Sequence, residues 1–149
     1  MVAFGGAAPL HAGRLCEKLG VARLLVPPGA GVGSAIGFLR APFSFEAARG
    51  LFQRLDSFNP GQVNEALAAL EAEASAFVDQ GAAGQPRRFE LTAQMRYVGQ
   101  GWEIPVALPR GPFSQHHVAE IEARFEAAYR GLFGRIIEGL AIEITNWLL

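Results

Sequence analysis

The sequence predicts an α/β protein in two parts, of which residues 41–149 form an antiparallel sheet covered by two helices. Three patterns lead to this prediction: two stretches with apolar residues at helical spacing, a pair of alternating runs joined at a glycine turn, and an alternating run at the end of the chain. From residue 43 onward their order is strand, helix, strand, strand, helix, strand. That order is typical of the ferredoxin-like βαββαβ sandwich, in which both helices lie on one face of the sheet.

Residues 1–40 form a shorter part with a different texture. Apolar spacing predicts a helix over 9–19, which opens with a proline and stops at a glycine. The β-rich run 21–26 ends at two prolines and predicts a short buried strand. Residues 29–39 are rich in glycine and alanine, which predicts a short helix packed closely on another backbone. We place the boundary between the two parts near Ala41–Pro42.

The first strand of the second part, within 43–55, is ambiguous because its aromatic residues fit both an alternating and a helical pattern. The residues alone leave the choice open, and the family resemblance of the motifs given below favours a strand. Asn59 and Pro60 then supply an N-cap and a first-turn proline, with Gln62 at the capping-box position. An apolar stripe follows, and the helix is expected to end at Gly81.

The best strand pattern in the chain is 89–97, which alternates apolar and polar side chains. The run 102–108 repeats the alternation after the turn Gly99–Gly101, which predicts an antiparallel hairpin, and Pro105 places its second strand at an edge or a bulge. Ser114 is expected to cap the second helix. That helix is predicted to stop at Gly131, before a final strand over 141–149.

Composition excludes several classes of function. The 13 basic and 14 acidic residues give a net charge of −1 and are scattered, so the chain has no electrostatic footprint for nucleic acid. Cys16 is the only cysteine, which excludes an internal disulfide and favours a reducing cytoplasm. The most apolar stretch, 21–39, is interrupted by Arg23, two prolines and several glycines, so no membrane span is expected. The apolar start has no preceding basic region, so we expect no signal peptide.

The stretch Ala3–His11, AFGGAAPLH, is the first candidate site. Gly5 and Gly6 would let a ligand approach the backbone, and the unpaired amides of the following helix favour an anionic or polar ligand such as a nucleotide. A glycine pair before a helix is also an ordinary tight turn. His11, as a lone histidine, is interpreted from the residues alone as a structural or capping group.

Arg96 and Gln100 form a second candidate site, since a guanidinium suits carboxylate or phosphate and Gln100 lies in a glycine-flanked turn. The alternative is that Arg96 pairs with Glu103 across the hairpin while Gln100 serves the turn. His116 and His117 lack a third ligand, so we predict no metal site. No paired acids or nucleophilic triad are visible, and we assign no catalytic residue.

Several of these motifs, AFGGAAPLH at the start, MRYVGQGWEIPV from Met95 and the closing AIEITNW, resemble the C-terminal end of the hydantoinase A/5-oxoprolinase family. The resemblance implies that residues 1–40 are the terminal segment of an incomplete actin-like ATPase domain, which precedes the C-terminal domain predicted from the order of elements to be ferredoxin-like, residues 41–149. It places Gly5, Gly6 and Ala7 on the adenosine side of ATP and makes His11 a polar contact to the nucleotide or to an upstream segment. The family's phosphate and metal motifs would lie upstream of Met1, so we expect a fragment that is inactive alone.

The resemblance also implies a parent protein that is an ATP-dependent amidohydrolase subunit acting on cyclic amides of the hydantoin or 5-oxoproline type. A carboxylase subunit of the acetone carboxylase type is one alternative, and a non-enzymatic ferredoxin-like interaction module is another. The parent would use ATP and a divalent metal, whereas we expect no cofactor for the fragment. The implied partners are the upstream ATPase segment and a hydantoinase B-like subunit. The open edge expected at 21–26 would also favour a homodimer.

Overall fold

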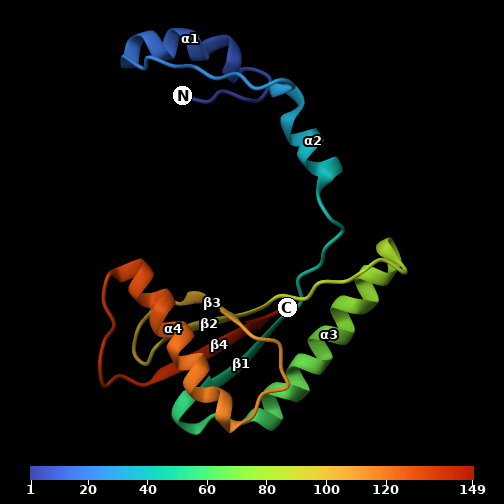
Figure 1. The fold of residues 1–149 in the computed structure, drawn as a ribbon, viewed down its shortest axis with the longest axis vertical. Helices are drawn as coiled ribbons and strands as arrows, with labels where there is room; N and C mark the ends of the chain where they lie inside the picture. The colour runs from blue at the N-terminus through green and yellow to red at the C-terminus, as the bar shows by residue number, and fades with distance from the viewer. The chain divides into compact units, whose positions relative to one another are not determined.

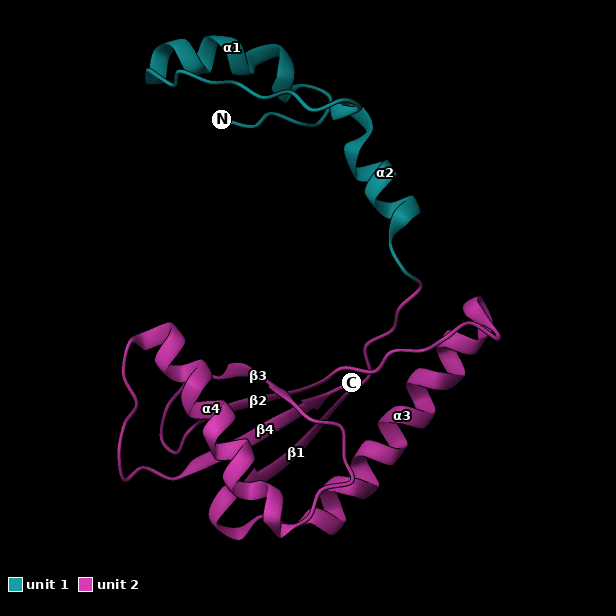
Figure 2. Ribbon diagram, viewed as in Figure 1, with its two compact units in different colours: residues 1–42 teal, residues 43–149 magenta.

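The computed structural model describes all 149 residues and divides into two compact units (Figures 1 and 2). Unit 1 is Met1–Pro42 and unit 2 is Phe43–Leu149. The division therefore falls two residues beyond the last residue of the predicted first part.

Unit 1 contains two helices, α1 (Ala8–Leu19) and α2 (Gly33–Arg40), with a 3₁₀ turn at Ala30–Val32 before α2. The first predicted helix is confirmed, and Gly20 ends it in the left-handed conformation with φ 64°. The prediction of a strand at 21–26 is wrong, because no strand forms there. The segment pairs at one point only, a parallel bridge from Leu25 to Val2, because the chain offers it no neighbouring strand except the first residues.

Very little is buried in unit 1. Its buried apolar residues are all small or medium in size: Ala3, Ala12, Cys16 and Ala30. α2 has no buried residue, and a Cβ added at Gly31, Gly33 or Gly37 would meet no atom within 4 Å. The expected close packing of this glycine-rich helix on another backbone is therefore absent from unit 1.

Unit 2 confirms the predicted order of elements: β1 (Ala48–Arg54), α3 (Pro60–Ala82), β2 (Leu91–Tyr97), β3 (Ile104–Leu108), α4 (Val118–Phe133) and β4 (Ile142–Leu148). The four strands form one antiparallel sheet in the order β1-β4-β2-β3. The ferredoxin-like order has the first and third strands at its centre, whereas here the second and fourth are central. Periodicity specifies which residues form strands, but it does not specify which strand lies beside which.

The core of unit 2 lies between the sheet and the two helices, because α3 and α4 contribute to the same buried cluster (Figure 1). β2 alternates buried and half-buried residues along its whole length, as predicted. Tyr97 meets Phe125 of α4 edge to face at 4.9 Å between ring centroids. Trp147 of β4 is fully buried, and its indole nitrogen donates to the Leu51 carbonyl at 3.0 Å. Unit 2 thus folds around a dense aromatic and aliphatic centre.

Helix ends differ from the sequence prediction in two places. α4 passes through Gly131 and stops at Gly134, whose φ is 75°. α3 likewise includes Gly81, which the ring of Phe43 overlies so closely that a Cβ there would collide with it. A glycine in a helical pattern therefore marks either the end of the helix or a close contact with another group. The sequence alone does not distinguish the two.

Of the groups that cap the helices of unit 2, one comes from an unexpected position. Asn59 caps α3 as predicted, since its side chain accepts from the Gln62 amide at 3.2 Å. The Asn59 amide, however, donates to the Gln53 side chain at 2.9 Å, so β1 supplies the group expected from Gln62. Ser114 forms a capping box with His117 at the turn before α4. No helix of the chain has the length and apolar character needed to cross a membrane.

Candidate functional site

The glycine turn of unit 1 leads directly into α1. Gly5 has φ 96°, a conformation that favours glycine, and its amide donates to the Ala30 carbonyl at 2.7 Å. Gly6 follows, and a Cβ added at either glycine would meet no atom within 4 Å. Ala7 is the N-cap residue of α1 and makes no side-chain cap hydrogen bond. The turn therefore presents bare backbone with open space in front of it.

His11 projects from the first turns of α1 and is exposed. It lines a shallow hollow of about 360 Å³ together with Ala8, Leu15 and the first residues of the chain. Of the four predicted nucleotide contacts, only His11 lines this hollow, so the predicted residues do not converge on one cavity within unit 1.

The family resemblance implies ATP as the ligand. Only the neutral part of ATP, its adenosine, fits this turn. The two glycines leave room for a flat base or a ribose, and the first turn of α1 carries no acidic side chain that would repel a nucleotide. Nothing basic lies in the turn to meet phosphates, and the one charged pair on α1, Arg14 with Glu17, lies further along the helix. The turn therefore suits the neutral adenosine part of a nucleotide, and it offers no charged side chain to phosphates.

Arg96 lies on the face of the sheet opposite the helices. Its Nε contacts the Glu143 carboxylate at 2.7 Å, and its Nη1 lies 3.6 Å from Glu103. The cross-hairpin pair with Glu103 is thus present, but the shorter contact is to Glu143, whose side chain is almost fully buried. Sequence reasoning missed Glu143, because the pair depends on β4 lying beside β2.

The strand register aligns a row of charges across this face, with Arg54 opposite Glu143, Glu143 opposite Arg96, and Glu103 beyond. Arg54 bonds instead to Asp56 at 2.6 Å, and this hydrogen bond lowers the pKa of the Asp56 carboxyl. Because the Arg96 guanidinium is paired with Glu143 and Glu103, it is not free to bind an anion.

Gln100 has a different environment from Arg96, so the structure does not bring the two predicted residues together. The Gln100 side-chain nitrogen donates to the Tyr129 hydroxyl of α4 at 2.9 Å. These two residues line a recess of about 430 Å³ with Gly101, Trp102 and Phe133, which we call the Trp102 recess. Trp102 was expected within the second strand of the hairpin, but it precedes β3 and is 77% exposed.

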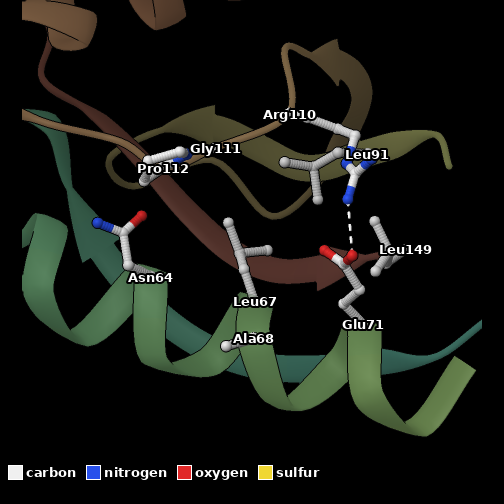
Figure 3. A pocket seen from close by; sticks show the side chains of 9 residues that line it. All are labelled: Asn64, Leu67, Ala68, Glu71, Leu91, Arg110, Gly111, Pro112 and Leu149. Carbon is white, nitrogen blue, oxygen red and sulfur yellow. Dashed lines mark hydrogen bonds and ion pairs between the residues drawn. The ribbon is translucent and has the colours of Figure 1, made fainter. Parts of the chain in front are cut away.

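A second recess, the α3 recess, lies between α3 and the loop after β3 (Figure 3). Leu67, Leu91 and Leu149 supply apolar walls, and Arg110 pairs with Glu71 across it at 2.7 Å. Asn64 holds the loop by bonding both the amide and the carbonyl of Phe113. At about 210 Å³ it lies below the usual size of a small-ligand pocket, and its polar groups satisfy one another.

Neither a metal site nor a nucleophile is assembled in the chain. No group of three His, Cys, Asp or Glu residues lies close enough together to hold a metal ion. Cys16 is buried, and its sulfur contacts the Met1 sulfur at 3.7 Å. The small buried thiol expected from the sequence is therefore confirmed.

The first third of the chain matches a known protein family. The family description "Hydantoinase/oxoprolinase" matches residues 1–47. Caprolactamase subunit alpha of Pseudomonas jessenii is 27% identical over 98% of this chain, and the 5-oxoprolinase PfmaA of Pestalotiopsis fici is 32% identical over 73% of it. The chain spans only 22% and 9% of the lengths of these two proteins.

Solved structures agree with the sequence relatives. The crystal structure of the ATP-dependent caprolactamase from Pseudomonas jessenii matches 99% of this chain and 22% of its own, with a TM-score of 0.75 and 25% identity. A nucleotide-free acetone carboxylase structure has the same coverage and TM-score at 19% identity, which supports the fold alone. Residues 1–47 thus match the hydantoinase/oxoprolinase family, and these similarities support a correspondence of the chain to the C-terminal part of its members.

Proposed function

We propose that this chain is the C-terminal segment of an ATP-dependent amidohydrolase subunit that opens cyclic amides, and that it is inactive alone. The single observation that carries the proposal is the bare glycine turn of unit 1, which lies within the matched family region and leaves space in front of Gly5 and Gly6. Two relatives are named as a caprolactamase and a 5-oxoprolinase, both of which act on lactam rings by name.

In the parent protein, Gly5, Gly6 and Ala7 would approach the adenosine of ATP, with His11 as a polar contact at the edge. ATP would supply phosphoryl activation of the amide carbonyl, and a divalent metal would accompany it. These four residues would bind and orient the nucleotide.

The segment would act together with an upstream ATPase segment and a hydantoinase B-like subunit in the cytoplasm. The name of one relative, a subunit alpha, supports an assembly of more than one kind of chain. Exposed apolar side chains on α1 and α2, such as Leu10, Phe38 and Leu39, are the surfaces that an upstream segment would cover.

The glycine turn is tested by Gly6→Val in the parent protein. Gly6 has an ordinary φ and open space around it, so valine fits the fold and obstructs only an approaching ligand. We expect the KM for ATP in lactam hydrolysis to rise about tenfold or more, with Gly13→Val on α1 as the matched control. Equal KM values for the two variants would remove the nucleotide role from this turn.

The chain by itself should show no ATP hydrolysis, because one adenosine-side loop cannot stabilise the charge of phosphoryl transfer. Turnover by the purified chain that survives deletion of residues 3–11 would contradict the proposal. Assays of the parent with a lactam, a hydantoin and a ketone plus bicarbonate separate amidohydrolase from carboxylase activity.

A further inference from the structure

The Trp102 recess has the chemistry of a small-ligand site. At about 430 Å³ it lies in the usual range for such sites, and three of its five lining residues are aromatic: Trp102, Tyr129 and Phe133. Trp102 and Phe133 are 77% and 53% exposed, which is a large aromatic area to leave in water. Flat apolar ligands bind to such faces by stacking.

The polar groups of the recess narrow the class of ligand. Tyr129 is 93% buried, and its hydroxyl oxygen accepts from the Gln100 nitrogen, but its own proton meets no acceptor in the protein. The Gln100 side-chain carbonyl likewise receives no hydrogen bond. A donor and an acceptor therefore lie side by side and unused at the rim of an aromatic recess, and no charged side chain lines it.

An adjacent donor and acceptor complement a carboxamide, which offers one carbonyl oxygen and an N–H beside it. We propose that the Trp102 recess binds a neutral, flat-ring carboxamide. The ring stacks on Trp102 and Phe133, the Tyr129 hydroxyl donates to the ligand carbonyl, and the Gln100 carbonyl accepts from the ligand N–H. This site lies in unit 2 and does not depend on the proposed nucleotide role of unit 1.

Benzamide is the simplest probe, and the two tryptophans report on it separately. Trp102 borders the recess, whereas Trp147 is fully buried and serves as an internal reference for the fold. In ¹⁵N spectra of the chain titrated with benzamide, we expect a saturable shift of the Trp102 indole signal with a dissociation constant on the order of millimolar, as suits so small a ligand. The Trp147 indole signal should stay in place.

Matched probes and variants test each part of the site. Tyr129→Phe should weaken benzamide about fivefold, the usual effect of losing one hydrogen bond, and N,N-dimethylbenzamide should bind less tightly because it has no N–H. Cyclohexanecarboxamide should bind less tightly because it cannot stack. Phe133→Ala should weaken binding, whereas Phe52→Ala, an equally exposed phenylalanine on β1, should not.

Three results would overturn the assignment: no saturable Trp102 shift up to about 20 mM benzamide, equal binding by cyclohexanecarboxamide, or unchanged binding in both Tyr129→Phe and Phe133→Ala. Because Phe133 is half exposed, its variant keeps the test valid even if the Tyr129 variant perturbs the core.

Discussion

Units 1 and 2 both form regular helices, but they differ in what those helices bury. α4 buries Ile121, Phe125 and Tyr129 against the sheet, whereas α1 buries only Ala12 and Cys16. Leu10 on α1 is 80% exposed, and α2 buries nothing. Local signals such as Pro9 and Gly20 are enough to specify where a helix begins and ends, but they do not supply the burial that holds a helix in place.

This difference in burial indicates that unit 2 supplies most of the stability of the chain. Short helices are marginal in water unless an apolar face is packed, and most of the apolar face of unit 1 is open. Unit 2 has a continuous buried cluster drawn from α3, α4, β2, β3 and β4, against which the partly buried Leu51 of β1 packs. The comparison yields three predictions, from the largest effect to the smallest.

The largest effect is expected when the chain is divided at Pro42. Phe43–Leu149 should unfold in one cooperative transition with nearly the melting temperature of the whole chain, because it contains the whole buried cluster. Met1–Pro42 alone should show no cooperative transition. Circular dichroism during heating measures both.

Light scattering extends this test. The whole chain should form dimers or larger species through the exposed apolar side chains of unit 1, and Phe43–Leu149 should be a monomer. A monomeric whole chain, or a Phe43–Leu149 segment that fails to fold, would show that unit 1 contributes to the core.

The sequence predicted the helices and strands of unit 2 and their order along the chain, but it did not predict the order of the strands within the sheet. Strict alternation identified β2, and helical spacing identified α3 and α4, because the periodicity of a buried face is written in adjacent residues. The central position of β4 depends on pairs such as Ala93 with Trp147, which lie far apart in sequence. Non-local pairing leaves no trace in a local pattern, so the strand order could not be predicted.

In the candidate sites, too, only the features formed by residues close together in sequence could be predicted. The Gly5–Gly6 turn is local, and the left-handed Gly5 was predictable from the glycine pair itself. The partner of Arg96 was predicted only in part, since Glu103 is near in sequence and Glu143 is not. The Trp102 recess needs Gln100 and Tyr129 from separate elements, and no spacing in the sequence connects them.

A medium effect is expected from truncating one large apolar side chain in each unit. Phe125→Ala removes a fully buried ring and should lower the free energy of unfolding by about 3–5 kcal/mol. Leu10→Ala, on the exposed face of α1, should change it by less than about 0.5 kcal/mol. Urea unfolding measures both. A loss of about 2 kcal/mol or more for Leu10→Ala would mean that this face is covered within the chain.

The smallest effect concerns two glycines inside the helices of unit 2. Gly131 has open space around it, so Gly131→Ala should stabilise the protein by about 0.5–1 kcal/mol through helix propensity alone. Gly81→Ala gains the same propensity but pushes Phe43 from its stack on Phe77, where the ring centroids lie 5.6 Å apart. That stack is worth about 0.5–1.5 kcal/mol, so the net change should be close to zero.

A double-mutant cycle separates the two contributions at Gly81. In a Phe43→Ala background, where no ring overlies the helix, Gly81→Ala should recover the full gain of about 0.5–1 kcal/mol seen at Gly131. Urea unfolding of the four proteins gives the coupling directly. Phe43 is the first residue of unit 2, so a measurable coupling means that the folded unit begins at this ring. Zero coupling would place the start of the unit further along the chain, at Phe45 or beyond, since Phe45 also stacks on Phe77.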